Sequence, residues 1–443
     1  MSAFTAEEAR ALLTRVMGLS RADACEANLF SNAGGNIRYA RNTVTTAGAT
    51  RDRTLVVQSS FGKRSGTATI NEFDDAALER VVRRAEELAR LAPEDPEFME
   101  PLEPQQYVAS GGWVEATAAV VPEFRARVAE ASIAAAKARN CTAAGFFNDS
   151  AQWQAMMNTK GLFAYYRSTN MNFTVTMRTD DGTGSGYALR DFNDVAKFDA
   201  AAASRIAVEK AAASREARAI EPGKYTVILE PEAAAGLIQF LMFNFAARNA
   251  DEGRSFLAKP GGGTRVGEKM VDERVTVFSD PQNADLPASP WGGDGRAMRR
   301  RSWIEDGVIR QLYYSRYWAA KQGVEAVPLP SNLVMAGGEA SVEQLVRDTP
   351  RGILVTRTWY IRPVDPQTLL LTGLTRDGTF YIENGAITHA VKNLRFNESP
   401  VIMLNNLDAL DKAERVNGEF GFPCLIPALR VRDFTFTSLS DAV

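Results

Sequence analysis

Among residues able to act in acid–base catalysis or metal binding, histidine is the rarest in this chain of 443 residues. His389 is the only one. No zinc site built on two histidines can therefore form within the chain. A cysteine–histidine dyad or a serine triad would also have to use His389. This residue follows the alternating stretch "YIENGAIT", which predicts a strand next to a turn. The main interpretation is a half-exposed strand histidine without a catalytic role.

The cysteines Cys25, Cys141 and Cys424 are far apart and odd in number, so they give neither a disulfide framework nor a CxxC pair. This usage suits a reducing compartment and predicts a cytoplasmic protein. No stretch offers about 18 consecutive apolar residues, and Thr5 with Glu8 predicts a helix capping box rather than a secretion signal. The net charge of −3 argues against nucleic acid or a membrane surface as a partner.

The stretch "GLIQFLMFNF", residues 236–245, follows a strand and a proline in "YTVILEPEAAA" and predicts the body of a helix. Apolar side chains lie in almost every direction around its axis, which is typical of a buried helix. Core packing is the main interpretation of its aromatic residues. A subunit interface or a peptide contact stays open as an alternative.

Charged residues gather in "TWYIRPVDPQTLLLTGLTRDGTF", where β-forming residues dominate. Arg357, Arg362, Asp365, Arg376 and Asp377 lie within this stretch. Ion pairs that hold a turn are one interpretation. The functional alternative is an exposed strand edge that docks an extended peptide, with arginines on its terminal carboxylate. On that alternative, the candidate substrate-binding residues are Arg357, Arg362, Arg376 and Asp377.

The first half of the chain mixes strands and helices. Residues 24–70 predict a run of short strands joined by glycine-containing turns such as "SNAGG" and "FGKRSG". The stretch "DDAALERVVRRAEELARLA" has apolar residues at helical spacing, and Pro93 ends it. A second long helix is expected over about 122–139, with Pro122 in its first turn.

From "EPGKYTVILEP" onwards, strand patterns dominate, so we place a domain boundary at about residue 220. The order of elements predicts an α+β fold rather than a regularly alternating parallel sheet. The expected domains are a mixed helix and strand domain over residues 1–220 and a mostly β domain over residues 221–443.

Several stretches resemble, in order along nearly the whole chain, the TldD/TldE (PmbA) family of microbial metallopeptidase subunits. The matching stretches include "NTKGLFAYYRSTNMNFTV", "EPGKYTVILEPEAAAGLI", "VGEKMVDERVTVFSD", "RRRSWIEDGVIRQLYYSRYWA", "FYIENGAITHAVKNLRF" and "PALRVRDFTF". The resemblance implies a two-domain fold and a heterodimer. It also implies that the TldD-like partner carries HExxxH and a cysteine ligand, that the TldE-like partner lacks them, and that together they enclose a cleft for unfolded peptides.

Carried over residue by residue, HExxxH falls on positions 239–244 of this chain, within about one position. Gln239 and Asn244 stand where the histidines would be, and their amide oxygens are poor zinc ligands. Phe240 stands where the glutamate base would be. Cys424 lies closer to the final strand than the family's cysteine ligand, so it is interpreted as a small apolar filler. We therefore expect no metal and no catalytic residue in this chain, with zinc only in a TldD-like partner.

The resemblance thus predicts a TldE/PmbA-like subunit that is inactive alone and belongs to a metallopeptidase complex acting on small or unfolded peptides. Its expected partner is a TldD-like HExxxH subunit. The alternative is a stand-alone homo-oligomer, such as a homodimer, that binds peptides or serves as a scaffold without a peptidase partner.

Overall fold

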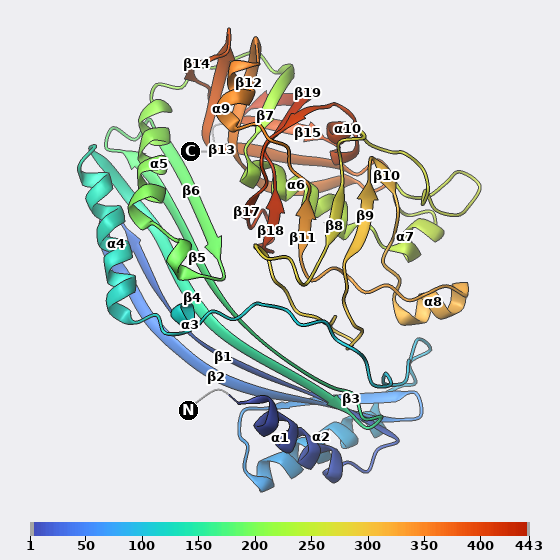
Figure 1. The fold of residues 1–443 in the computed structure, drawn as a ribbon. Helices are drawn as coiled ribbons and strands as arrows, with labels where there is room; N and C mark the ends of the chain where they lie inside the picture. Colours follow the sequence, from blue (N-terminus) through green and yellow to red (C-terminus); the bar gives the residue numbers. More distant parts are fainter. Residues whose placement is uncertain (1–3, 441–443) are drawn as a thin grey trace.

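The computed structural model describes residues 4–440. Figure 1 shows a long curved sheet from the first half of the chain, with the second half packed on its inner side. Helices and strands follow one another along the chain without regular alternation, and the first sheet is antiparallel throughout. The α+β class predicted from the sequence is confirmed. Within residues 4–440, no helix combines the length and apolar composition needed to cross a bilayer.

Six strands form the first sheet in the order β3-β2-β1-β4-β5-β6. Four of them are long, with 17 residues in β1 and β5, 18 in β4 and 19 in β2. The bounds are β1 Ala24–Ala40, β2 Thr43–Phe61, β3 Arg64–Ile70, β4 Cys141–Asn158, β5 Phe163–Thr179 and β6 Ser185–Phe192.

The predicted turn "SNAGG" lies inside β1, so the prediction of short strands is wrong there. A Cβ atom on Gly34 would lie 2.2 Å from the backbone oxygen of Asp149. A Cβ atom on Gly35 would lie 2.2 Å from Cζ of Arg125. These glycines therefore permit close approach of neighbouring groups rather than a chain reversal. The stretch "FGKRSG" does form the predicted turn, between β2 and β3.

Two pairs of helices cover the outer face of this sheet (Figure 1). α1 (Ala6–Leu19) and α2 (Asp75–Leu91) share a hydrophobic cluster with one end of the sheet. α4 (Pro122–Lys137) and α5 (Ala200–Ala213) share another cluster with the opposite end. Both long helices predicted from the sequence are present, and each buries one apolar face.

Helix starts follow signals in the sequence. Thr5 accepts a hydrogen bond from the backbone N–H of Glu8 at 3.2 Å, and the Glu8 carboxylate accepts from the Thr5 N–H at 2.8 Å. The predicted capping box is therefore present. Pro122 occupies the first turn of α4, where its missing N–H costs nothing.

The middle of the other face of the first sheet carries polar side chains; successive side chains of a strand point to opposite faces. Asn32 on β1 lies opposite Gln152 on β4, which lies opposite Ser168 on β5. Asn170 and Asn172 continue the same face of β5 and are partly exposed. Amide and hydroxyl groups therefore line the middle of the side of the sheet that faces the second half of the chain.

Five strands of the second half close into a barrel in the order β12-β7-β19-β15-β13, with β13 pairing back onto β12. β14 extends β13, and β16 pairs with β19. The bounds are β7 Gly223–Leu229, β12 Arg351–Asp365, β13 Leu370–Glu383, β14 Ala386–Ala390, β15 Leu394–Glu398, β16 Leu407–Leu410 and β19 Leu429–Leu439.

A second sheet lies beside the barrel in the order β10-β9-β8-β11-β18-β17. The helix α6 (Pro231–Phe243) shares the largest hydrophobic cluster with residues of both the barrel and this sheet. The strand bounds are β8 Val277–Ser279, β9 Arg301–Glu305, β10 Val308–Ile309, β11 Leu333–Met335, β17 Glu414–Val416 and β18 Cys424–Ile426. The remaining helices are α3 Glu115–Ala118, η1 Val195–Lys197, α7 Ala247–Asp251, α8 Arg316–Gln322, α9 Val342–Arg347 and α10 Pro400–Asn405.

Candidate functional site

The strand β7 leads directly into α6, the helix on which the family signature would lie. Pro231 occupies its first turn, where a proline is compatible with helix geometry. From Ala233 to Met242 every residue is buried. Phe243 is the exception at 42% exposure. The prediction of a buried apolar helix is confirmed except at this last residue.

Gln239 is 1% exposed, and its amide is fully engaged in hydrogen bonds. Its Nε2 donates to the backbone oxygens of Asn417 at 2.7 Å and Phe422 at 2.8 Å. Its Oε1 accepts from the backbone N–H of Phe420 at 3.3 Å. Gln239 therefore ties the loop of residues 417–423, which connects β17 to β18, onto α6.

The other two signature positions also lack ligand or base chemistry. The Phe240 ring packs against Phe420, with ring centroids 4.8 Å apart. Phe243 packs against the same ring at 5.0 Å. Asn244 follows the last residue of α6, and its Nδ2 donates to the backbone oxygen of Phe240 at 2.8 Å. Phe240, Phe243 and Phe420 thus form an aromatic cluster at the end of α6.

Cys424 is fully buried at the start of β18, as expected of a small apolar filler. The structure adds a contact that the sequence did not predict, because the Cys424 sulfur lies 3.6 Å from Nε2 of Gln239. The Cys424 thiol donates to the backbone oxygen of Val416 at 3.5 Å. Burial raises the pKa of this thiol well above its usual range, so the sulfur is protonated at neutral pH.

The residues around Gln239 do not fit a zinc ion. Zinc needs lone pairs from thiolate, imidazole or carboxylate groups. Gln239 instead points its N–H groups at backbone carbonyls, and Cys424 holds a protonated thiol. Across residues 4–440, no three side chains of histidine, cysteine, aspartate or glutamate lie close enough together to hold a metal ion.

Glu232 holds the same loop from the other end of α6. Its carboxylate accepts from the backbone N–H groups of Asn417 at 3.2 Å and Gly418 at 3.1 Å. Burial raises the pKa of Glu232, and the two N–H donors oppose that rise. The loop is thus fixed to the helix at two points, Glu232 and Gln239.

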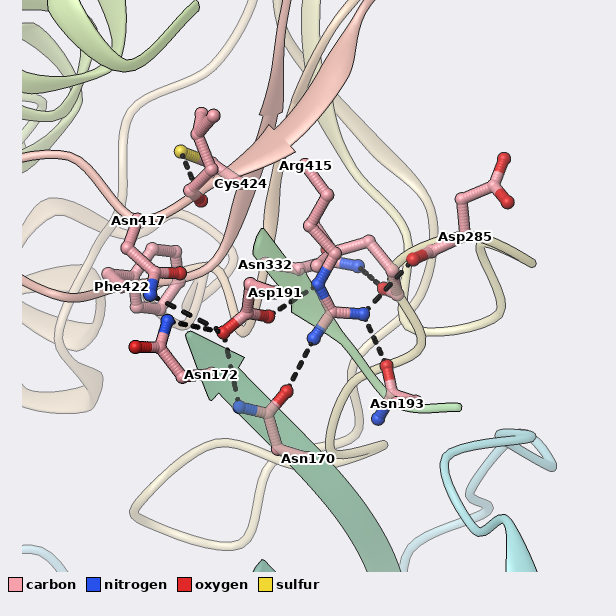
Figure 2. Close-up of polar contacts among 12 residues, drawn as sticks. Asn170, Asn172, Asp191, Asn193, Asp285, Asn332, Arg415, Asn417, Phe422 and Cys424 are labelled. Carbon is pink, nitrogen blue, oxygen red and sulfur yellow. Dashed lines mark hydrogen bonds and ion pairs between the residues drawn. The ribbon is translucent and has the colours of Figure 1, made fainter. Parts of the chain in front are cut away.

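A buried ion pair joins the first sheet to the second half of the chain (Figure 2). Arg415 on β17 donates from Nε to Asp191 on β6 at 2.7 Å, and their side chains are 6% and 1% exposed. The Arg415 guanidinium also donates to the side-chain oxygen of Asn170 at 2.8 Å. Its remaining donors reach the side chain of Asn193 and the backbone oxygen of Asp285. Arg415 is therefore satisfied by groups from several distant segments.

Asp191 is surrounded by side-chain amides (Figure 2). Its Oδ2 accepts from Nδ2 of Asn170 at 3.2 Å, of Asn172 at 3.1 Å and of Asn417 at 3.3 Å. Asn417 belongs to the loop that α6 holds, so this network is continuous with the signature helix. The network was not predicted from the sequence. Its visible signal was the pair Asn170 and Asn172 on one face of a strand.

Two of the predicted peptide-binding arginines share one buried carboxylate. Asp377 is 4% exposed and lies 3.2 Å from Nη1 of Arg357 and 3.6 Å from Nε of Arg376. It also accepts from Oγ of Ser185 on β6 at 2.6 Å. The Arg357 guanidinium lies 4.3 Å from the Tyr187 ring centroid. These contacts match the ion-pair interpretation and connect the barrel to the first sheet, while a role in peptide binding stays a prediction.

Arg362 lies apart from that group. Its Nη1 is 3.7 Å from the Glu419 carboxylate, and its guanidinium is 4.2 Å from the Tyr360 ring centroid. His389 stacks on Tyr381 with ring centroids 5.0 Å apart, and its Nδ1 is 3.0 Å from Oγ1 of Thr388. No thiol or carboxylate is among these contacts, in line with a strand histidine.

A cleft of about 700 Å³ opens between the first sheet and the N-terminal end of α6. β6 and α5 form one wall, and α9, β12 and β17 contribute to the other. The ion pair between Lys210 and Glu230, at 2.5 Å, lies in its lining. We call this space the junction cleft; it was not predicted from the sequence.

Comparison with known families gives matches along most of the chain. The model for the PmbA/TldA metallopeptidase C-terminal domain matches residues 222–438. The models for the central domain and for domain 1 match residues 116–215 and 25–89. These models divide the chain into three segments, whereas the division into two domains at residue 220 stays a prediction.

Individual relatives agree with these models. The chain is 23% identical over 395 residues to "Metalloprotease PmbA" of Escherichia coli O157:H7, which covers 84% of each protein. A metalloprotease of Methanothermobacter thermautotrophicus is 22% identical over 282 residues, which covers 58% of this chain and 59% of that protein.

Solved structures share the fold. TldE from Thermococcus kodakarensis superimposes with a TM-score of 0.87 at 18% identity, over 98% of this chain and 100% of that one. A protein from Thermotoga maritima gives a TM-score of 0.85 at 16% identity, over 97% of this chain and 100% of that one. Together with the family models over residues 25–438, this means that the chain belongs to the PmbA/TldD metallopeptidase family.

Proposed function

We propose that this chain is the non-catalytic, TldE-like subunit of a TldD/TldE-type metallopeptidase, and that a TldD-like partner carries HExxxH and the zinc. The observation that carries the proposal is the amide of Gln239. Its N–H groups donate to the backbone oxygens of Asn417 and Phe422, so this position presents donors where a metal needs lone pairs. With Phe240 at the base position, no side chain there activates water.

The aromatic end of α6 supports a role in assembly. Phe243 and Phe420 are 42% and 49% exposed, and their ring centroids are 5.0 Å apart. Exposed clusters of large apolar side chains are typical of contact surfaces. The expected occupant is the TldD-like subunit or its peptide. In the alternative function, a stand-alone homo-oligomer, a second copy of this chain would cover them.

The test compares the chain alone with its complex with a TldD-like subunit. We expect the chain alone to carry no stoichiometric zinc by elemental analysis and to leave unfolded peptides intact. The complex should cleave them, and replacing the HExxxH glutamate of the partner should abolish cleavage. One tightly bound zinc per chain, with metal-dependent cleavage by the chain alone, would overturn the proposal. A stable homo-oligomer that binds peptide but no TldD-like subunit would favour the alternative.

Peptide binding by Arg357, Arg362, Arg376 and Asp377 is the part of the proposal that rests on the arginine-rich strands. A peptide carboxylate would compete with Asp377 for Arg357 and Arg376. We expect Arg376→Ala to weaken peptide cleavage by the complex, and His389→Ala to leave it nearly unchanged. A larger loss of cleavage for His389→Ala than for Arg376→Ala, in the same steady-state assay, would show that these arginines do not bind the peptide.

A further inference from the structure

The junction cleft combines acidic groups with an apolar wall. Five carboxylates line it, from Glu209, Glu230, Glu232, Glu343 and Glu414. Three basic side chains oppose them, from Arg190, Lys210 and Arg347. The balance of formal charge is therefore 3 minus 5, or −2. Such a lining attracts a cation rather than an anion.

Two of these carboxylates are available at the rim. Glu209 and Glu414 are exposed, and neither forms an ion pair with another residue of the described chain. The carboxyl of the neighbouring residue Asp411 lies in the electrostatic field of three glutamates of the cleft. Its pKa is raised chiefly by burial, and Glu414, Glu230 and Glu343 each add to the rise.

Part of the lining is apolar. Leu189, Leu354 and Phe380, which are nearly buried, provide this apolar surface.

We propose that the junction cleft binds the amino-terminal residue of a peptide, with its ammonium group on the acidic lining and an apolar first side chain on the apolar wall. This deepens the proposed function and rests on it, since it names the end of the peptide that this subunit holds. An amino-terminal residue carries its charge and its apolar side chain on the same carbon atom, which matches acidic and apolar surfaces that lie side by side. The volume of about 700 Å³ is in the range of small-ligand sites.

The test measures binding to the full chain alone by calorimetry, without a partner and without cleavage. The probe is the amidated peptide Leu-Gly-Gly, and its matched control is the N-acetylated form, which lacks the ammonium charge. We expect acetylation to weaken binding about tenfold or more, the effect of losing one charge-assisted hydrogen bond. A third peptide, N-acetyl-Lys-Gly-Gly-amide, places the ammonium on a side chain and should bind as weakly as the acetylated control.

Variants assign the binding to the cleft. The double variant Glu209→Gln/Glu414→Gln should weaken binding of the free-amino peptide, whereas Glu130→Gln, on the exposed face of α4, should not. Ala213→Trp, at an exposed position of the lining, should block the cleft and abolish binding.

Each contrary result is decisive. Equal binding of the acetylated peptide, no saturable binding of the free-amino peptide, or binding untouched by Ala213→Trp would overturn the proposal. Preferential binding of the lysine peptide would overturn it in favour of a side-chain site. All of these outcomes are independent of zinc content and cleavage, so they are distinguishable from a failure of the proposed function.

Discussion

At the scale of single residues, Gln239 holds a loop in place. Its amide makes three hydrogen bonds to the backbone of the 417–423 loop. A histidine or carboxylate here would have to give up those bonds or leave backbone groups unpaired. The Gln239 side chain is therefore committed to the loop.

Gln239→Ala should destabilise the protein. It leaves the backbone oxygens of Asn417 and Phe422 without their donor, and each buried unpaired group costs about 1–3 kcal/mol. Chemical unfolding should show this loss, and limited proteolysis should cut faster within 417–423. Gln322→Ala, an exposed position near the end of α8, is the matched control and should change stability by less than about 0.5 kcal/mol. Equal stability of the two variants would contradict this role of Gln239.

Asp411 should make stability depend on pH. It is 4% exposed, and burial raises the pKa of its carboxyl to about 7, with the Ala428 N–H opposing the rise. An unfolded chain releases this proton near its usual pKa of 3.8, whereas the folded protein retains it up to about 7. Its stabilising contribution is therefore full below pH 3.8 and is lost as the pH rises towards 7.

Asp411→Asn removes this titration while keeping an oxygen for the Ala428 N–H. We expect the variant to gain stability relative to the parent as the pH rises from the usual pKa of 3.8 towards 7, and the difference to be constant above that. Unfolding by denaturant across this range measures the difference. A difference that does not change with pH would show that Asp411 titrates normally in the fold.

At the scale of elements, β1 shows how glycine can mark a contact instead of a turn. Gly34 and Gly35 continue a strand of 17 residues, because other groups lie where their side chains would be. Beneath Gly35 lies the buried ion pair of Arg125 and Asp149, whose side chains are 8% and 5% exposed. The strand therefore depends on small residues at one place along its length.

Gly35→Ala should cost about 1–3 kcal/mol, because its Cβ would lie 2.2 Å from Cζ of Arg125 and would displace a buried ion pair. Gly48→Ala in the neighbouring strand is the matched control, since no atom lies closer than 3.8 Å to its Cβ. Thermal unfolding of the two variants gives the comparison. Equal melting temperatures for Gly35→Ala and Gly48→Ala would show that the Arg125 guanidinium has room to move aside.

At the scale of the whole molecule, the two halves meet through buried polar groups. Arg415 reaches Asp191 across the junction, and Ser185 on β6 donates to Asp377 on the barrel. Such groups tolerate little misplacement, because an unpaired buried charge is costly. The network therefore fixes how the first sheet sits against β17 and the 417–423 loop (Figure 2).

Arg415→Ala should destabilise the protein by about 3–5 kcal/mol, since Asp191 would stay buried without its counter-charge. The double variant Arg415→Ala/Asp191→Asn should recover part of this loss, and together with the two single variants it gives a double-mutant cycle that measures the coupling energy. Arg254→Ala, which breaks an exposed pair with Glu252, is the control and should cost at most about 1 kcal/mol. Additive losses for the two junction residues would mean that they do not act as a pair.

The sequence by itself determined the family, the α+β class, the long helices and the buried character of α6, because these follow from local periodicity, caps and ordered resemblance. It also identified Gln239, Phe240 and Asn244 as unlike metal ligands, which depends only on side-chain chemistry. It misread "SNAGG", because whether a glycine turns the chain or admits a neighbour depends on what lies opposite it.

Only the tertiary structure brought Cys424 to within 3.6 Å of Gln239 and Arg415 onto Asp191. These residues are 185 and 224 positions apart along the chain, so no local pattern relates them. The junction cleft has the same origin, since its lining comes from β6, α5, α6, α9, β12, β13, β14 and β17. Contacts of this kind form when packed elements fold back on one another, and spacing along the sequence does not encode them.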